Sequence, residues 1–430
     1  MIKKKVLIVA SYPISDAHHG GQKRVKAIYD FYKTIFSEVR FAAVFHRSYY
    51  PDTSVDSFLL GQPDVIEQLD TMPYASELIT GEAIDKDVHV RSAIAKLLIE
   101  YQPDIIQIEQ GFAYLGLKAV LRDLGMKPKI IFSSQNIEYL MKKSIYEELG
   151  VSSEKIKELV NKTRELEVEL CETADLVIAV SEHDADIQRT MGAKSVVVAP
   201  NGISKVKVSA SQLKYWREFK NKKKINKIVT FIGSGHPPNW VGFLGMVGLD
   251  TTFLTSDSRL ILAGGVADYF RDTYERTDNQ KFWKRAIAIG TLSDAKLSGL
   301  LSESEVILLP IISGGGSNLK TAEAILSGKK IVSTDYAFRG FEKYKELPNI
   351  FFADNGADFK KLIIKALKSP YIMPSSSQSV LAEQVQWQYC LKPLLPELKK
   401  LSWRINVVRV WRKAKISGRK TAKYIKDLIA

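Results

Sequence analysis

Short apolar runs alternate with longer stretches of helical periodicity along most of the chain. In the first half, these runs occupy residues 6–10, 105–108, 129–132, 176–180 and 196–199. Runs that are apolar at nearly every position are typical of strands buried on both faces, and strands that alternate with helices form parallel sheets. The first half therefore predicts a doubly wound α/β domain.

The same pattern starts again after a polar, charged segment at residues 222–227. Further apolar runs occupy residues 228–233, 260–265, 286–290, 306–310 and 330–334. We therefore expect a second doubly wound domain, with the boundary near residues 205–225. The predicted fold class is α/β, with two Rossmann-like domains.

Length and composition agree with two folded domains. The chain has 430 residues, of which 45% are hydrophobic, enough for two cores of roughly 200 residues each. No apolar stretch approaches the roughly 18 residues of a membrane-spanning helix, and the first run is too short for a secretory signal. The two cysteines, Cys171 and Cys390, predict no disulfide framework and favour a cytoplasmic location.

The positive charge is concentrated at the C-terminal end. The net charge is +14, and residues 397–430 hold 11 Lys or Arg against 2 Asp or Glu, a local charge of +9. Apolar residues recur there at helical spacing: Leu398, Leu401, Ile405, Val408 and Trp411. A basic amphipathic helix binds anionic membrane surfaces or packs on its own protein with its charges in water, and both alternatives are open. No nucleic-acid-binding motif is present, so we expect no nucleic acid partner.

The segment after the run at residues 306–310 has the strongest chemical character. Glycines 314–316 precede a helix pattern that ends at Gly328. Glycines let the backbone approach a ligand, and the free N–H groups of a first helical turn favour phosphate. Lys320 adds a cation in that turn, and Glu323 lies three residues later on the same helix face. The segment predicts a site for a diphosphate and a ribose; the alternative is a flexible loop followed by a helix with an exposed ion pair.

This segment resembles the donor-site signature of retaining GT-B glycosyltransferases of family four, and more narrowly their subgroup with a triple-glycine loop. Other parts of the chain resemble the same family in the same order. They are Gly20-Gly21, the segment from Gln135 to Tyr139, residues 174–182 and 200–202, and Ile232-Gly233-Ser234 with Pro238-Asn239. The resemblance covers roughly residues 5 to 365.

The resemblance implies a GT-B fold whose two domains face a central cleft. Residues 1–205 would form the acceptor-side domain, completed by helices within residues 376–400. Residues 215–375 would form the domain that binds the nucleotide-sugar donor, and residues 401–430 a basic amphipathic tail.

The resemblance also implies roles for individual residues. Lys320 and Gln135 are the catalytic candidates, and Asn136 and Glu138 would contact the acceptor side. No metal ligands and no cofactor are expected. Residues expected to bind the donor are Gly20, Gly21, Gly233, Ser234, Thr291, Leu292, Gly315, Gly316, Ser317, Asn318, Lys320 and Glu323.

Two positions depart from the broad family. Gly315 stands where the family has a glutamate, a change that the triple-glycine subgroup shares. Gln135 stands where the family usually has a histidine, and glutamine forms hydrogen bonds but does not titrate.

We expect a transferase that moves a sugar, with retention, from a nucleotide-sugar to a saccharide or lipid-linked acceptor in surface polysaccharide biosynthesis, at the inner face of the membrane. The alternative is a non-catalytic partner that binds a nucleotide-sugar and activates or scaffolds another transferase.

Overall fold

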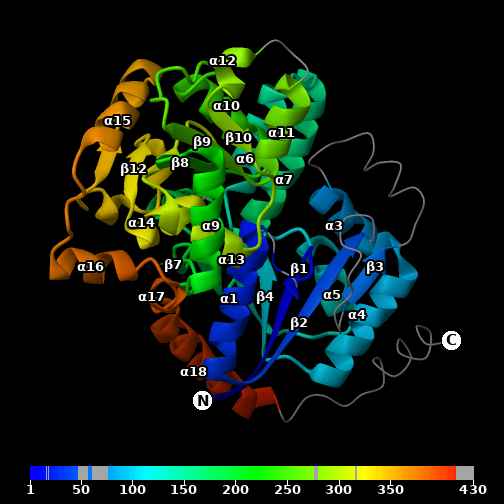
Figure 1. Cartoon of the computed structure of the whole chain (residues 1–430). Helices are drawn as coiled ribbons and strands as arrows, with labels where there is room; N and C mark the ends of the chain where they lie inside the picture. The colour runs from blue at the N-terminus through cyan, green and yellow to red at the C-terminus, as the bar shows by residue number, and fades with distance from the viewer. Residues whose placement is uncertain are drawn as a thin grey trace. The chain divides into compact units, whose positions relative to one another are not determined.

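The chain forms two compact units (Figure 1). The computed structural model describes residues 1–46 except 16 and 18, together with 57–60, 76–275, 279–314 and 317–412. The first unit contains Met1–Pro200 and the chain from Leu391 on, and the second contains Asn201–Cys390.

The first unit is built on a seven-stranded parallel sheet in the order β3-β2-β1-β4-β5-β6-β7. Strands β4 and β6 are buried along their whole length, as expected for strands that helices cover on both faces. The strands are β1 (Ile2–Ala10), β2 (Phe36–His46), β3 (Ser57–Leu60), β4 (Ile105–Glu109), β5 (Lys129–Ser133), β6 (Leu176–Ala179) and β7 (Val196–Val198).

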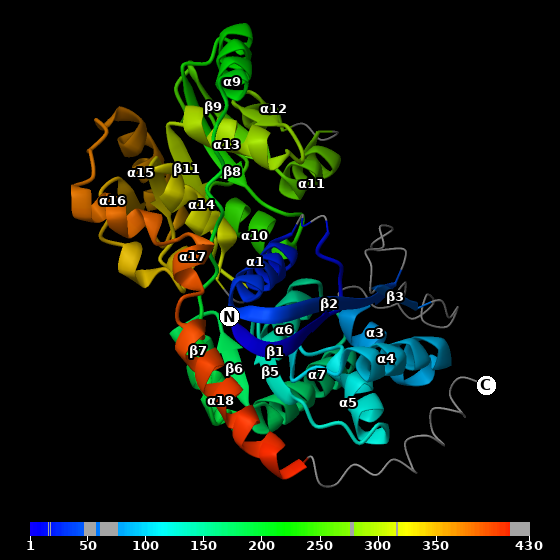
Figure 2. The ribbon, with the colours of Figure 1, turned by 90° about the horizontal axis from the view of Figure 1, so that it is seen from below.

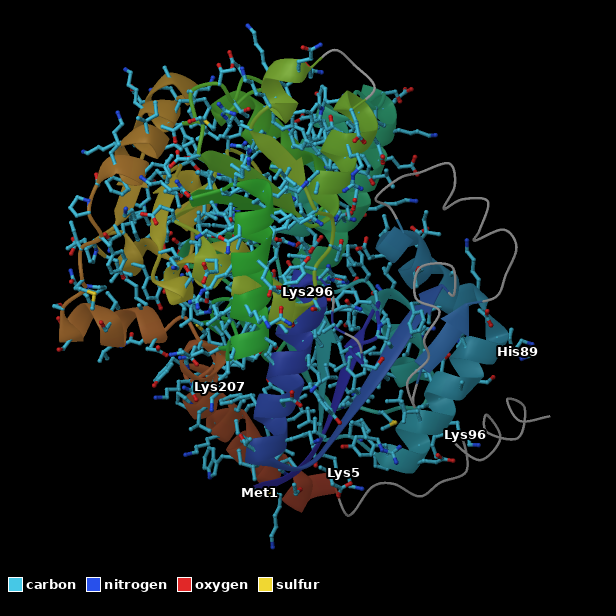
Figure 3. The ribbon with its side chains drawn as sticks, viewed as in Figure 1. Met1, Lys5, His89, Lys96, Lys207 and Lys296 are labelled. Atoms are coloured by element: carbon cyan, nitrogen blue, oxygen red, sulfur yellow. The ribbon has the colours of Figure 1, made fainter. Side chains whose placement is uncertain are left out.

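Amphipathic helices flank this sheet. In α4, Ile94 and Leu98 are buried, whereas His89 and Lys96 point outward to solvent (Figure 3), because residues three or four apart share one helix face. The helices of this unit are α1 (Gly20–Ile35), α3 (Ser76–Lys86), α4 (Val88–Tyr101), α5 (Tyr114–Asp123), α6 (Glu138–Glu148), α7 (Ser153–Thr173), α8 (Glu182–Thr190) and α18 (Leu394–Arg412).

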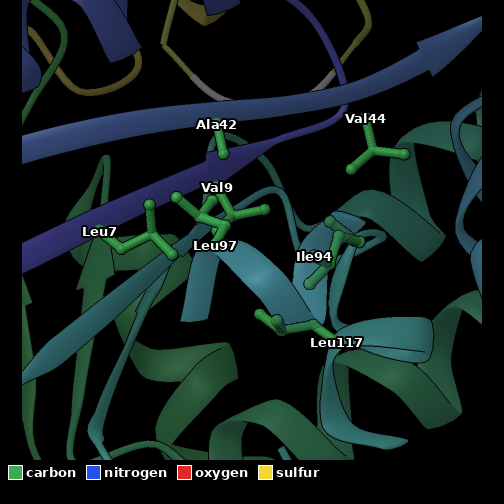
Figure 4. Close-up of a pocket in the computed structure, with 8 residues that line it drawn as sticks. Leu7, Val9, Ala42, Val44, Ile94, Leu97 and Leu117 are labelled. Carbon is green, nitrogen blue, oxygen red and sulfur yellow. The ribbon is translucent and has the colours of Figure 1, made fainter. Parts of the chain in front are cut away.

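A small cavity lies in the core of the first unit, between β1, β2, α4 and α5 (Figure 4). A sugar needs hydrogen-bond partners, and a cavity with an apolar lining stays dry. The cavity is therefore a packing gap and not a sugar site. The residues that line it are Leu7, Val9, Ala42, Val44, Ile94, Leu97, Ala113 and Leu117.

The second unit contains a six-stranded parallel sheet in the order β10-β9-β8-β11-β12-β13. Its strands are β8 (Lys227–Ile232), β9 (Ser258–Ala263), β10 (Ala286–Ala288), β11 (Val306–Leu309), β12 (Lys330–Ser333) and β13 (Ile350–Phe352). Its α-helices are α9 (Ala210–Lys223), α10 (Pro237–Met246), α11 (Gly265–Tyr274), α12 (Gln280–Trp283), α13 (Asp294–Glu303), α14 (Leu319–Ser327), α15 (Gly356–Lys368), α16 (Ser376–Glu383) and α17 (Trp387–Cys390); two 3-10 helices, η1 (Tyr336–Phe338) and η2 (Glu342–Tyr344), precede β13.

The predicted α/β class, with two doubly wound sheets, is confirmed. Each of the ten apolar runs corresponds to a strand of the expected sheet. The sequence did not predict β2, β3 and β13. Charged residues such as Glu38 and Arg40 interrupt the first half of β2, and the apolar run at residues 41–45 in its second half was overlooked. Strand β13 has only three residues and is too short to present such a run.

The structure corrects one expected assignment near the C-terminus. Residues 376–390, expected to complete the first domain, lie in the second unit. Ile203 pairs with Gln386 in an isolated parallel bridge, and its N–H donates to the Val385 carbonyl at 2.9 Å. Val385 is itself buried in the apolar core of the second unit. Backbone pairing with the start of this unit therefore holds the segment there.

The chain returns to the first unit through α18, which lies against β1 and β7 (Figure 2). Leu398, Leu401 and Ile405 are buried, and Trp403 on the same helix is 68% exposed. The first part of the predicted apolar stripe is therefore a packing surface. The side chains of Val408 and Trp411, and all residues after Arg412, lie outside the described residues. None of the described helices combines the length and apolarity of a membrane-spanning segment.

We expect Leu398→Ala to lower the free energy of unfolding by about 2–5 kcal/mol, because it leaves a cavity where a fully buried side chain joined α18 to the sheet. Urea denaturation followed by fluorescence measures the change. Trp403→Ala, on the exposed face of the same helix, is the control and should change stability by about 0.5 kcal/mol or less. Equal stability of the Leu398 variant and the parent would show that α18 does not contribute to the fold.

Candidate active site

The strand order of the second sheet predicts a ligand crevice at the carboxyl ends of its central strands. Strand β8 lies between β9 and β11, and the chain leaves β8 towards α10 and β11 towards α14. The strand order reverses at this point, and open α/β sheets bind ligands where such a reversal separates two neighbouring loops. The first turns of α10 and α14 therefore border the same crevice.

Lys320 and Asn239 connect these two helix starts. The Lys320 ammonium donates a short hydrogen bond to Asn239 Oδ1. The Asn239 amide in turn donates to the carbonyl and the hydroxyl of Ser234, at 3.0 and 2.9 Å. Asn239 is buried, whereas Lys320 is partly exposed, so the lysine charge is held at the crevice by a fixed neutral partner.

The surrounding protein lowers the pKa of Lys320 to about 8, because burial removes water from the ammonium; the nearby Glu323 carboxylate acts in the opposite direction. At neutral pH the lysine is thus charged but poorly solvated. An anion that reaches it replaces the missing water and holds the proton more firmly.

The described part of the loop before α14 combines a glycine in the left-handed region with a helix start that no side chain of the cap covers. Gly314 has φ 108°, a conformation that residues with a side chain rarely adopt. The Ser317 carbonyl accepts a 3.0 Å hydrogen bond from Asn201. Asn318 is the N-cap residue of α14, but its side chain forms no cap hydrogen bond, so no side chain of the cap covers the first-turn N–H groups. Gly315 and Gly316 lie outside the described residues.

The remaining donor candidates of this unit lie at the same edge of the sheet. Gly233 and Ser234 follow β8 directly. Thr291 and Leu292 follow β10, which β9 separates from β8. Glu323 lies in α14, one turn beyond Lys320. The structure thus brings Ser234 and Lys320 together through Asn239 and places Thr291 and Leu292 two strands away.

The first unit carries a buried polar chain at the carboxyl ends of β4 and β5. Gln135 Nε2 donates to Tyr12 Oη at 2.5 Å and to Glu109 Oε2 at 3.3 Å. The other oxygen of Glu109 accepts from Gln107 at 2.5 Å, and Gln107 accepts from Tyr32 at 2.5 Å. With the Nε2 group directed to Glu109 and Tyr12, the carbonyl oxygen of Gln135 is the atom left for a ligand.

Helix α1 lies directly against this amide. A Cβ at Gly21 would stand 2.5 Å from Gln135 Oε1 and 2.8 Å from Tyr12 Oη, so only glycine fits at this approach. His19 caps α1, whose first residue is Gly20. The structure therefore brings Gly20, Gly21 and Gln135 together at one point of the first unit.

Asn136 and Glu138 belong to a neighbouring cluster of buried acids. Asn136 donates to Glu138 Oε1 at 3.2 Å, and the Glu138 and Tyr139 N–H groups donate to Glu167 at 2.8 and 3.0 Å. Burial raises the pKa of Glu138 to about 7 and that of Glu167 to about 8. Glu138 is 1% exposed, so its carboxyl group belongs to the interior of this unit as described.

Lys142 supplies the counter-charge of this cluster and lies 3.3 Å from a Glu77 oxygen. Although burial disfavours its charge, the neighbouring carboxylates keep the pKa of Lys142 above its usual value. One ammonium faces three acids, and this imbalance favours protonation of Glu138 and Glu167. The described residues, this cluster included, contain no group of three or more His, Cys, Asp or Glu side chains that could hold a metal ion.

Several residues of these networks were not predicted from the sequence as site residues. Among them are Asn239, which lies in the first turn of α10, and Tyr12, which follows β1. The Pro238-Asn239 pair after a glycine loop was a usable signal, because prolines at a helix start predict that the next residue lies in the first turn. The contact of Tyr12 with Gln135 spans 123 positions, which no local pattern encodes.

Comparisons with known proteins agree with this architecture. Residues 72–205 match the model of Glycosyltransferase Family 4. All of the matched segment except residues 201–205 lies in the first unit, and it includes Glu109, Gln135 and Glu138. A comparison of the sequence with curated proteins finds no match.

Solved structures with the same fold include three carbohydrate-related proteins. Sucrose-phosphate synthase from Thermosynechococcus elongatus superposes with a TM-score of 0.65 at 15% identity, covering 96% of this chain and 100% of the other. HepE of Anabaena, in complex with UDP-glucose, gives 0.61 at 17% identity, covering 92% and 100%. WaaG, a glycosyltransferase involved in lipopolysaccharide biosynthesis, gives 0.56 at 13% identity, covering 93% and 99%. The GT-B fold is thus shared along nearly the whole chain.

The buried acids make a testable contribution to stability. A carboxyl group with a raised pKa binds a proton more tightly in the folded state, so the free energy of unfolding should fall as pH rises from about 5 through 7 and 8. Glu138→Gln removes one such group and should reduce this fall by on the order of 1–3 kcal/mol. Urea denaturation at several pH values measures it.

Glu147→Gln is the matched control, because Glu147 lies on the same helix and is exposed. It should leave the pH dependence of stability as in the parent. If Glu138→Gln shows the parental pH dependence as well, the Glu138 carboxyl group is ionised in the folded protein at neutral pH and the assignment of its proton is wrong.

Proposed function

We propose that this protein is a glycosyltransferase whose second unit binds a nucleotide-sugar and whose first unit binds the acceptor. The observation that carries the proposal is the contact of Lys320 with Asn239 across the crevice between β8 and β11. This contact sets a poorly solvated cation beside an N-terminal helical turn, and both features favour a diphosphate.

In this reaction the bond between the anomeric carbon and the diphosphate oxygen breaks. A new bond forms between that carbon and an acceptor hydroxyl oxygen, whose proton passes to the departing diphosphate oxygen. Negative charge collects on the departing diphosphate, and preorganised positive groups stabilise it without reorganisation. Lys320 supplies a full charge and the start of α14 a partial one, while Glu323 is proposed to hold the ribose hydroxyls.

These groups support a reaction that needs no metal ion, and the proposal includes none. The resemblance of the glycine loop further supports retention at the anomeric carbon. It also supports a saccharide or lipid-linked acceptor in surface polysaccharide assembly. The +9 charge of residues 397–430 supports a peripheral position on an anionic membrane, because each basic residue near such a surface contributes about 1 kcal/mol.

A second candidate function is that of a non-catalytic partner that binds a nucleotide-sugar. It is favoured by Gln135, whose amide does not titrate and whose Nε2 group is directed to Glu109 and Tyr12. Sugar transfer or donor hydrolysis by the purified protein separates the two candidates. The donors to test are those that raise the melting temperature in a screen of UDP-, GDP-, ADP- and CMP-sugars.

For the transferase, Lys320→Ala should lower the transfer rate about 10²- to 10³-fold, because it removes one preorganised charge that faces the leaving diphosphate. Rates are measured with the donor selected by the melting screen. Lys296→Ala, an exposed lysine of α13 visible in Figure 3, is the control and should retain the parental rate. A Lys320 variant with the parental transfer rate would exclude this residue from the site.

Diphosphate affinity should also depend on pH. The pKa of Lys320 is about 8 in the free protein, and a bound diphosphate raises it, so binding prefers the protonated lysine. Calorimetry with UDP or ADP should show an affinity that is constant near pH 7 and falls roughly tenfold by about pH 9. The second phosphate proton, with a pKa of about 6, has already left in this range. Constant affinity up to about pH 9 would mean that the lysine charge does not contribute to binding.

A further inference from the structure

A second segment of the same unit supports the glycine loop from the side of β12. Residues 334–339, here called the bracket, follow β12, which pairs with β11, so both segments leave the sheet at the same edge. The Thr334 hydroxyl donates to the Ile311 carbonyl. The Thr334 N–H donates to the Leu309 carbonyl at 3.2 Å. The first residues after β11 are therefore fastened to the end of β12.

The bracket also reaches the helix that follows the loop. The Thr321 hydroxyl, in the first turn of α14, donates to the Ala337 carbonyl at 2.6 Å, and Thr321 is fully buried. The residues on both sides of the loop between β11 and α14 are thus attached to one short segment.

Two further side chains of the bracket hold the middle of the loop. The Tyr336 hydroxyl donates to the Gly314 carbonyl at 2.5 Å, and Arg339 Nη2 donates to the same oxygen at 3.0 Å. The Arg339 guanidinium lies 4.4 Å from the centre of the Tyr336 ring. One carbonyl oxygen therefore accepts two hydrogen bonds from a stacked pair, one of whose members carries a permanent charge.

Gly314 is the residue at which such support has the largest effect. Its backbone has φ 108°, which glycine enters without strain but also leaves easily. On its other side, a Cβ at Gly314 would lie 3.5 Å from Pro238 in the first turn of α10. Gly314 is therefore held between the bracket and the helix start that carries Asn239.

Carbonyl oxygens repel phosphate oxygens, so an anion site needs its carbonyl groups turned away or covered. Two donors on the Gly314 oxygen offset its partial negative charge and fix its direction before a ligand arrives. Preorganisation of this kind strengthens binding, because the ordering of the loop is not subtracted from the affinity.

We propose that Tyr336 and Arg339 are positioning residues for the diphosphate, which fix the direction of the Gly314 carbonyl before the nucleotide binds. This inference rests on the proposed function of the second unit. It assigns a task to two residues outside the resemblance to the donor signature.

The two side chains are suited to a test because neither is part of the core. Tyr336 is 36% exposed and Arg339 is partly exposed, whereas Thr334 and Thr321 are buried and their replacement would disturb the fold. Tyr336→Phe removes a single oxygen and keeps the ring beneath the guanidinium. Arg339→Ala removes both the second hydrogen bond and the charge.

The experiment measures two quantities in the full-length protein. Calorimetry gives the Kd of UDP and of ADP, and hydrogen exchange gives the protection of peptides that cover residues 311–320 without ligand. We expect about tenfold weaker binding for Arg339→Ala and about threefold for Tyr336→Phe, from the loss of a charged and of a neutral hydrogen bond. Both variants should exchange faster than the parent in these peptides.

Arg259→Ala is the matched control, because this guanidinium also donates to backbone carbonyls, those of Ser256 and Ser258, but at the start of β9. It should change neither the affinity for the nucleotide nor the hydrogen exchange of residues 311–320.

If the parent binds UDP or ADP and both bracket variants bind equally well, the positioning role is wrong while the proposed function stands. If the parent binds neither UDP nor ADP, and GDP and CMP do not bind either, the proposed function fails and the inference with it. Parental exchange rates in both variants would likewise overturn the ordering of the loop by the bracket.

Discussion

Parallel pairing of buried strands is the constraint on which the other features of this protein depend. Each strand enters its sheet in the same direction, so every loop that follows a strand leaves at the carboxyl edge. In the second unit this brings together residues 233–234, 239, 314 and 317–320, which are up to 87 positions apart in the chain. The connections are therefore free to carry polar chemistry, while the strands themselves supply the apolar core.

The two units treat buried polarity in opposite ways. In the second unit, the Lys320 cation lies at the crevice, where it is partly exposed and its partner Asn239 is neutral. The first unit places carboxyl groups in the interior, where Glu109 is fully buried and Glu138 is 1% exposed. A buried carboxyl group resists ionisation unless a cation compensates it. A protonated acid next to Lys142 satisfies this requirement without a second lysine.

Hydrogen-bond direction gives the polar chain of the first unit its specificity. Glu109 and Tyr12 both accept from the same amide nitrogen of Gln135. A flip of that amide, which exchanges its nitrogen and oxygen, would set the oxygen against the Glu109 carboxylate. The packing of Gly21 against the remaining oxygen leaves little space for another orientation. The glutamine is therefore a fixed acceptor for a hydroxyl group, in the place where a histidine would offer a titratable nitrogen.

The sequence by itself determined the fold class, the two doubly wound sheets and the loop that begins at Gly314. The reason is that apolar runs, and glycines before a helix, are local signals, each of which spans no more than about twenty residues. Only the tertiary structure decided that Asn239 contacts Lys320, that residues 376–390 lie in the second unit, and that Leu398 packs on the first. These outcomes depend on strand order and on the meeting of distant segments. A periodic pattern states which face of an element is apolar but not which neighbour covers it.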